Sequence, residues 1–79
     1  MSWLQLVKQV GFYICSRRQF LHHSQECLAL NIFADKTYLR RLEKGQVNIS
    51  LRLLSRISCG LEISVYEFVR NIELSFCSF

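Results

Sequence analysis

Apolar residues recur at intervals of three and four along this 79-residue chain, and no proline interrupts them. This spacing places side chains on one face of an α-helix, whereas small strand-rich domains need more turn residues than three glycines provide. Five such sets follow one another, and they begin at Leu6, Leu28, Tyr38, Leu51 and Val65. We therefore predict an all-α fold, a compact five-helix bundle in which residues 1–79 form a single domain.

Capping residues separate these sets. Ser24, Asp35 and Ser50 precede the second, third and fourth sets, and each can accept a hydrogen bond from the first turn of a helix. Ser64 and Glu67 have the spacing of a capping box. Gly45 is expected to end the third helix in the left-handed conformation.

The second and third predicted helices are short and nearly contiguous. Residues 25 to about 32 form one, residues 36–44 the other, and only three residues separate them. A connection this tight between two short helices is typical of a helix-turn-helix. An ordinary helical hairpin is the alternative.

The outward face of the third helix carries Lys36, Thr37, Arg40 and Arg41. No acidic residue stands four positions from these cations within the helix to offset their charge. Arginine and lysine can donate to guanine, and a threonine methyl can contact thymine. The net charge of +4 fits a nucleic-acid partner, but it also fits a membrane surface or an acidic protein. The clustering of the cations on one helix therefore favours DNA more strongly than the net charge does. The alternative is a solvated charged face.

Several stretches together resemble the Cro/phage-repressor type of helix-turn-helix protein. They are Ser24-Gln25-Glu26, Leu28-Ala29, Asp35-Lys36-Thr37-Tyr38-Leu39, Leu42-Glu43-Lys44-Gly45, Asn48-Ile49-Ser50-Leu51 and Leu61-Glu62-Ile63-Ser64. The similarity runs from about Val10 to Phe68. Within this superfamily, the Asp35–Asn48 segment and the chain length resemble the controller proteins of restriction–modification systems.

The resemblance implies a lambda-repressor-like fold and a sequence-specific transcriptional regulator that binds a palindromic operator in double-stranded DNA as a homodimer. The DNA-binding residues it implies are Gln25, Lys36, Thr37, Tyr38, Arg40, Arg41, Lys44 and Asn48. It also implies a buried structural ion pair between Arg18 and Glu43. A protein-interaction module of the same fold, such as an antitoxin or an adaptor, is the alternative function.

The chain departs from the family pattern at three places. Phe33 stands in the turn where glycine is usual, because one residue there needs positive φ. We expect either a different path for this turn or packing of Phe33 that offsets the strain. His22-His23 replaces the usual Gly-Leu, and Val47 replaces a frequent basic residue.

The C-terminal segment of about residues 64–79 is unusually apolar for a chain end. Phe68, Val69, Ile72 and Phe76 follow one another at helical spacing. They are expected either to form a two-fold dimer interface or to cover the core of their own chain.

Other site types are not expected. His22, His23 and Cys27 lack a second Cys/His pair for a structural zinc, and no carboxylate orients a Cys–His pair for catalysis. The chain is therefore expected to be no enzyme and to have no metal, cofactor or small-molecule ligand. No apolar run reaches the roughly 18 residues of a membrane span. With four scattered cysteines and no secretory signal, we expect a cytoplasmic, nucleoid-associated protein with reduced thiols.

Overall fold

The structure, a computed structural model, describes the backbone of residues 3–77 and the side chains of residues 3–73. Across this part of the chain there are five α-helices and no strand. They are α1 (Trp3–Phe20), α2 (Gln25–Asn31), α3 (Lys36–Glu43), α4 (Leu51–Gly60) and α5 (Val65–Cys77). The predicted all-α, five-helix fold is confirmed.

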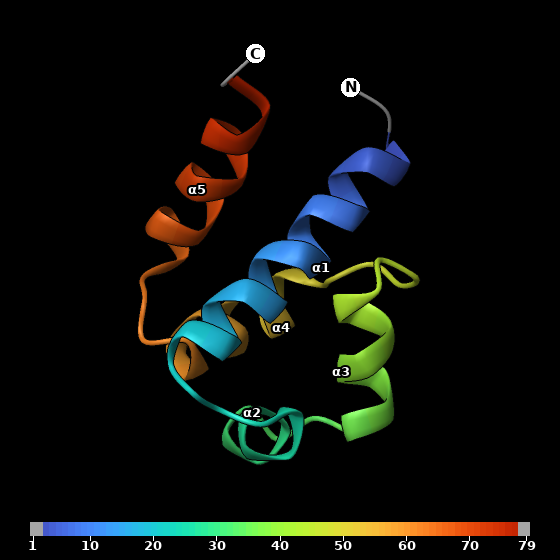
Figure 1. The fold of residues 1–79 in the computed structure, drawn as a ribbon, viewed down its shortest axis with the longest axis vertical. Coiled ribbons are helices and arrows are strands. Elements are labelled where there is room, and N and C mark those ends of the chain that lie inside the picture. Colours follow the sequence, from blue (N-terminus) through green and yellow to red (C-terminus); the bar gives the residue numbers. More distant parts are fainter. Residues whose placement is uncertain (1–2, 78–79) are drawn as a thin grey trace.

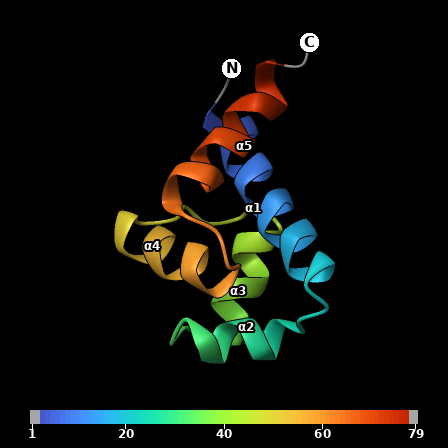
Figure 2. The same ribbon diagram turned by 90° about the vertical axis from the view of Figure 1, so that its left-hand side faces the viewer.

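The helices form an elongated bundle of 35 × 22 × 22 Å. The start of α1 and the end of α5 lie at one end of the long axis, and α2 lies across the opposite end (Figure 1). A quarter turn shows α5 in front of α1, with α4 to one side (Figure 2). The short α3 is therefore held beside α1 while α5 occupies another part of the bundle.

All five helices contribute to one core. Ile14, Leu28, Leu39, Ile57 and Leu61 are fully buried in it. The α1–α3 contact is especially close, because a Cβ added to Gly11 would lie 2.3 Å from the carbonyl oxygen of Leu42. Burying one such aliphatic side chain contributes about 1.5–3 kcal/mol, so packing rather than helix propensity holds these short helices.

Helix starts follow the predicted caps with one exception. Ser24 Oγ accepts from Cys27 N, Ser50 Oγ from Leu53 N, and Ser64 Oγ from Glu67 N. The Asp35 side chain makes no cap hydrogen bond at α3, so the capping role expected for its carboxylate was wrong. Asp35 still marks the N-cap position, and its carbonyl oxygen accepts from Leu39 N.

Four of the helices, α1 to α4, each end in the same type of hydrogen-bonding motif. In α2, Phe33 N donates to Leu30 O and Ala34 N to Ala29 O, which is the Schellman pair of bonds. Equivalent pairs end α1, α3 and α4. The residues at the left-handed position are His22, Phe33, Gly45 and Glu62, with φ of 60°, 56°, 72° and 62°. Only one of the four is glycine, the residue that adopts this conformation without strain.

Phe33 contradicts both outcomes expected for the turn. The turn keeps the usual path with positive φ, and the Phe33 side chain is 86 % exposed. It therefore gains no packing that offsets the strain. The backbone bonds from Phe33 N and Ala34 N hold the conformation instead.

Candidate nucleic-acid interface

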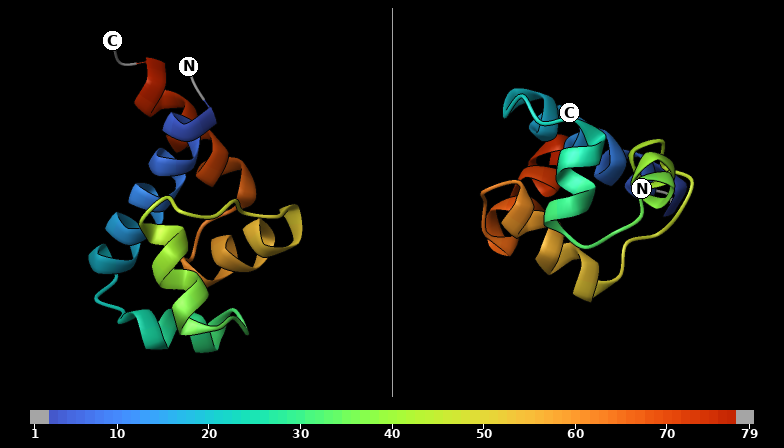
Figure 3. Two further views of the ribbon diagram at one scale, coloured as in Figure 1. Left: turned by 90° about the vertical axis from the view of Figure 1, so that its right-hand side faces the viewer. Right: turned by 90° about the horizontal axis from the view of Figure 1, so that it is seen from below.

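The two faces of α3 differ sharply. Leu39 and Leu42 are buried in the core, and Tyr38 is half-buried. The exposed residues of the helix are Lys36, Thr37, Arg40 and Arg41, followed by the C-cap Lys44. Figure 3 (left) shows α3 in front of the bundle, with no other helix over its outer side. The division between buried and exposed positions is the one that the spacing predicted.

Lys36 has an acidic partner outside α3, which the spacing of residues within that helix could not predict. Lys36 Nζ lies 3.3 Å from Glu26 Oε1 of α2. Both side chains are largely exposed, at 44 % and 72 %, so the pair contributes at most about 1 kcal/mol. Within the described residues, Arg40, Arg41 and Lys44 have no acidic partner, and uncompensated charge is thus concentrated toward the end of α3.

Behind this surface, Arg18 of α1 and Glu43 of α3 form a bidentate ion pair. Arg18 Nε and Nη2 donate to Glu43 Oε2 and Oε1 at 2.8 and 3.1 Å. The two side chains are only 11 % and 4 % exposed. Arg18 Nη1 also donates to the carbonyl oxygen of His23 at 2.8 Å. The pair therefore ties α1 to α3 and to the loop before α2.

The charges of this pair act on their neighbours. The hydrogen bond to Glu43 raises the pKa of Arg18 above its ordinary value, so its charge is retained at any physiological pH. Burial, followed by the Glu43 carboxylate, raises the pKa of the Cys15 thiol. Cys15 thus remains a neutral thiol, and it accepts a weak hydrogen bond of 3.6 Å from Arg18 Nη2.

Gln25 belongs to the same network. Its Nε2 donates to Glu43 Oε1 at 2.9 Å, so the amide expected to bind a phosphate is already bonded within the protein. Gln25 also borders a polar hollow with Arg18, Ser24, Glu26 and Lys36. This link between α2 and α3 was not predicted, because its two side chains are 18 residues apart.

The segment after α3 is extended and alternates in burial. Val47 and Ile49 pack against the core, whereas Gln46, Asn48 and Ser50 are exposed. Gly45 begins the segment at φ 72°, and a Cβ there would lie 2.9 Å from the Cα of Lys8. Tyr38 Oη donates to the carbonyl oxygen of Asn48 at 2.8 Å. Asn48 is therefore attached to α3 through its backbone, and it is exposed although it also lines the cavity beside Val7.

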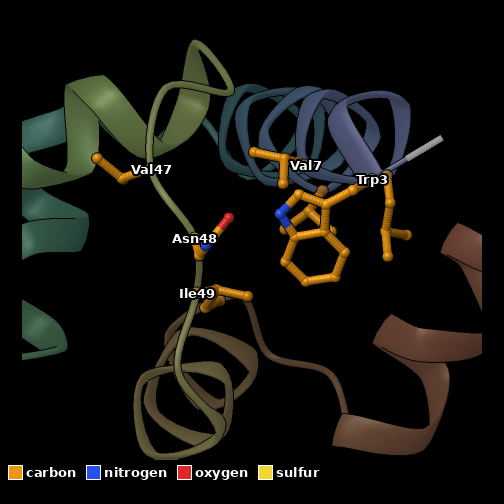
Figure 4. Close-up of a pocket in the computed structure, with 7 residues that line it drawn as sticks. Trp3, Val7, Val47, Asn48 and Ile49 are labelled. Atoms are coloured by element: carbon orange, nitrogen blue, oxygen red, sulfur yellow. The ribbon is translucent and has the colours of Figure 1, made fainter.

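A small cavity lies between this segment and the start of α1. It has a volume of about 60 Å³. Its lining includes Trp3, Val7, Val47, Asn48 and Ile49, and Figure 4 shows Trp3 and Val7 facing the segment from α1. Val47, a departure from the family pattern, thus packs inward. Sequence reasoning assigned no role to Trp3, because only the fold brings it to this segment.

The residues expected at a dimer interface have different environments. Phe68 and Ile72 are 2 % and 6 % exposed in the core of their own chain, so they already have packing partners there. Val69 is 49 % exposed, and Val65 and Tyr66 on the same helix are also exposed. The Phe76 side chain lies outside the described residues.

The remaining features are candidate metal ligands, the cysteines and the apolar length of the helices. Within the described side chains, no three His, Cys, Asp or Glu residues cluster closely enough to hold a metal ion. Cys15, Cys27 and Cys59 are free thiols. Among the described helices, none has the length and apolar character to cross a membrane.

Fold and surface together define a helix-turn-helix protein, in which α2 and α3 form the motif and α3 presents its polar face. No family model matches the chain. The control protein C.MunI of Mycoplasma sp is 40 % identical over 57 residues, which cover 72 % of this chain and 77 % of that protein.

Solved structures are similar over most of the chain. The wild-type restriction–modification controller protein C.Esp1396I is 28 % identical, with a TM-score of 0.86 over 100 % of both chains. The controller protein C.AhdI from Aeromonas hydrophila is 30 % identical, with a TM-score of 0.76 over 84 % of this chain and 98 % of that one. The chain belongs to the restriction–modification controller proteins.

Proposed function

We propose that the protein is a sequence-specific DNA-binding regulator of transcription that inserts α3 into the major groove of a palindromic operator. The observation that carries this proposal is the exposed, unpaired charge of Arg40, Arg41 and Lys44 on a helix whose opposite side is buried. A short helix anchored in this way can enter the major groove without unfolding its support.

The residues of the surface divide into two groups. Lys36, Thr37, Arg40 and Arg41 face base edges and the flanking phosphates, with Tyr38 beside them. Lys44 and Asn48 contact the phosphate backbone, and so does Gln25, whose amide keeps a second proton besides the one donated to Glu43. The weak Lys36–Glu26 pair can exchange for a phosphate at little cost, since both side chains are largely exposed.

A relative supports DNA binding. The C.Esp1396I tetramer has been solved in complex with its natural 35-base-pair operator, and that chain is 30 % identical to this one with a TM-score of 0.80. The similarity covers 91 % of this chain and 92 % of that one. We extend DNA binding, and action in the cytoplasm on the nucleoid, to this protein.

We further propose that the operator is bound by a homodimer. An apolar groove of about 150 Å³ runs between α1 and α5. It is lined by Leu6, Val10, Ile49, Leu54, Phe68, Val69 and Ile72. Pairing of two chains through the exposed Val65, Tyr66 and Val69 would cover this groove and leave α3 free. Two recognition helices about 34 Å apart would then match one turn of DNA.

A gel-shift titration with the DNA upstream of its own gene tests the proposal. We expect a discrete complex whose affinity falls steeply as salt rises, because lysine and arginine release counterions from phosphates. A scrambled fragment of equal length should bind more weakly. Absence of a complex, or an affinity independent of salt, would contradict DNA binding.

A further inference from the structure

We propose that the DNA-binding surface extends beyond the helix-turn-helix onto α1, where the Lys8 ammonium binds a phosphate of the DNA backbone beside Lys44. The inference rests on the proposed DNA-binding function and deepens it, because it adds a further helix to the same surface. Sequence spacing could not identify Lys8, since only the fold brings α1 to the end of α3.

The turn after α3 is packed directly against Lys8. A Cβ added to Gly45 would lie 2.9 Å from both the Cα and the Cγ of Lys8, and 3.4 Å from its Cβ. The absence of a side chain at Gly45 therefore makes room for both the backbone and the stem of Lys8. Since the ammonium ends the same four-carbon stem, Lys8 places its charge beside the turn that follows Lys44.

Lys8 lies at the rim of the contact between α1 and α3. Gly11 is buried, and a Cβ added there would lie 2.3 Å from the carbonyl oxygen of Leu42. Residues three apart share a helix face, so Lys8 belongs to the face of α1 that is turned toward α3, but it is exposed. Figure 3 (left) shows the turn after α3 crossing in front of α1. Lys8 therefore reaches solvent at the end of α3.

The charge of Lys8 has no acidic partner within the described residues. The carboxylate of Glu43 is near in the fold, but its side chain is only 4 % exposed and its oxygens already accept from Arg18 and Gln25. Lys44 is also exposed and without an acidic partner in this part of the chain. Two uncompensated cations thus lie side by side, and a polyanion would neutralise both.

The end of α3 does not need Lys8 as a cap. A cation near a helix C-terminus can donate to the last carbonyl groups. Here the carbonyl oxygens of residues 40–42 already accept from the backbone N–H groups of residues 44–46. Capping of α3 therefore does not account for the position of Lys8.

The chemistry of Lys8 favours a phosphate as its ligand. Lysine presents a compact point charge without the planar fork of arginine, and contacts to phosphates carry no sequence information. Lys44 and Asn48, which are proposed to bind the DNA backbone, follow the same end of α3. Lys8 should thus add affinity that depends on salt and is independent of sequence.

Salt titrations of DNA affinity by fluorescence anisotropy test the inference. The probes are the DNA upstream of the protein's own gene and a scrambled fragment of equal length. Lys8→Gln removes the charge and keeps most of the stem. We expect the slope of log affinity against log salt to become less steep by about 0.9 for each bound chain. Both fragments should lose affinity by the same factor, and Lys8→Arg should retain the wild-type slope.

Arg70→Gln is the matched control. It removes one positive charge from an exposed position on α5, so the net charge changes as it does in Lys8→Gln. Its affinity and its salt slope should remain close to those of the wild type. Thermal denaturation should show both variants folded, because neither position is buried.

Three results would overturn the inference while leaving the proposed function intact. A wild-type affinity and slope in Lys8→Gln would show that Lys8 binds no phosphate. Equal reductions of the slope in Lys8→Gln and Arg70→Gln would show an effect of net charge alone. A greater loss on the upstream DNA than on the scrambled fragment would show that Lys8 acts on bases. Absence of DNA binding by the wild type would instead remove the proposed function and the role of Lys8 with it.

Discussion

At the scale of single residues, Phe33 is the least expected feature of the chain. It adopts φ 56° with its side chain exposed, although a left-handed conformation costs a non-glycine residue about 1 kcal/mol or more. His22 and Glu62 occupy the same position in other helix ends. The chain therefore tolerates strain at three helix ends, because the paired backbone hydrogen bonds satisfy the last carbonyl groups.

Replacing Phe33 with glycine should raise the free energy of unfolding by about 1 kcal/mol, because glycine relieves the strain and no packing is lost. Urea denaturation measures this change. Phe33→Ala is the matched control: it removes the same ring but keeps the Cβ, and it should not stabilise. Equal stability of the glycine and alanine variants would contradict the claim that the backbone at Phe33 is strained.

Cys15 should make stability depend on pH at the alkaline end. Its pKa is raised in the folded chain, chiefly by burial, so the unfolded thiol loses its proton first. Its contribution to stability is therefore fully present below about pH 9 and is lost as pH rises through the higher folded value. The difference in unfolding free energy between wild type and Cys15→Ala should show this decline. A difference independent of pH would contradict it.

At the scale of elements, much of the fold could be predicted from local spacing. The sets beginning at Leu28, Tyr38 and Leu51 lie in α2, α3 and α4 as expected. Contacts between distant side chains could not be predicted in this way. Gln25 and Glu43 are 18 residues apart, and Trp3 reaches the segment after α3 only through the packing of α1.

Apolar periodicity also cannot distinguish the protein's own core from a partner. Phe68, Val69 and Ile72 share the spacing of one apolar set, yet Phe68 and Ile72 are buried within the chain and Val69 is half exposed. The pattern identifies the side of α5 that avoids water. Which surface covers it depends on how α5 packs against α1 and α4.

The ion pair between α1 and α3 should be a large contributor to stability. Glu43→Gln keeps the shape of the side chain but leaves the Arg18 cation buried without its counter-charge. We expect a loss of about 3 kcal/mol in unfolding free energy, measured by thermal or urea denaturation. Glu26→Gln, in the exposed pair with Lys36, should change stability by no more than about 1 kcal/mol. Equal effects of the two variants would contradict the assigned burial.

At the scale of the whole molecule, the proposed dimer depends on the exposed apolar part of α5. Val69→Glu should shift the protein toward the monomer, because it introduces a charge where two chains would meet. Sedimentation equilibrium measures the shift. Ser55→Glu on the exposed side of α4 is the control and should leave the assembly unchanged. If the Val69→Glu variant remained a dimer, the interface would have to lie on another part of the surface.

The bundle separates the two proposed interfaces. α3 lies to one side of α1, and α5 lies apart from it toward the end of the long axis (Figure 1). The core joins them through α1, which contacts both helices. One short chain can therefore combine a DNA-binding surface with a surface for its partner.

The central claim is that α3 reads DNA sequence through Arg40 and Arg41. Its most direct test is the ratio of affinities for the operator and for a fragment with altered half-sites, measured by fluorescence anisotropy at fixed salt. In the Arg40→Ala/Arg41→Ala variant we predict a loss of about 1–3 kcal/mol per base contact and a ratio close to one. Arg70→Ala, an exposed arginine on α5, should bind like wild type. An unchanged affinity and ratio in the double variant would contradict the account.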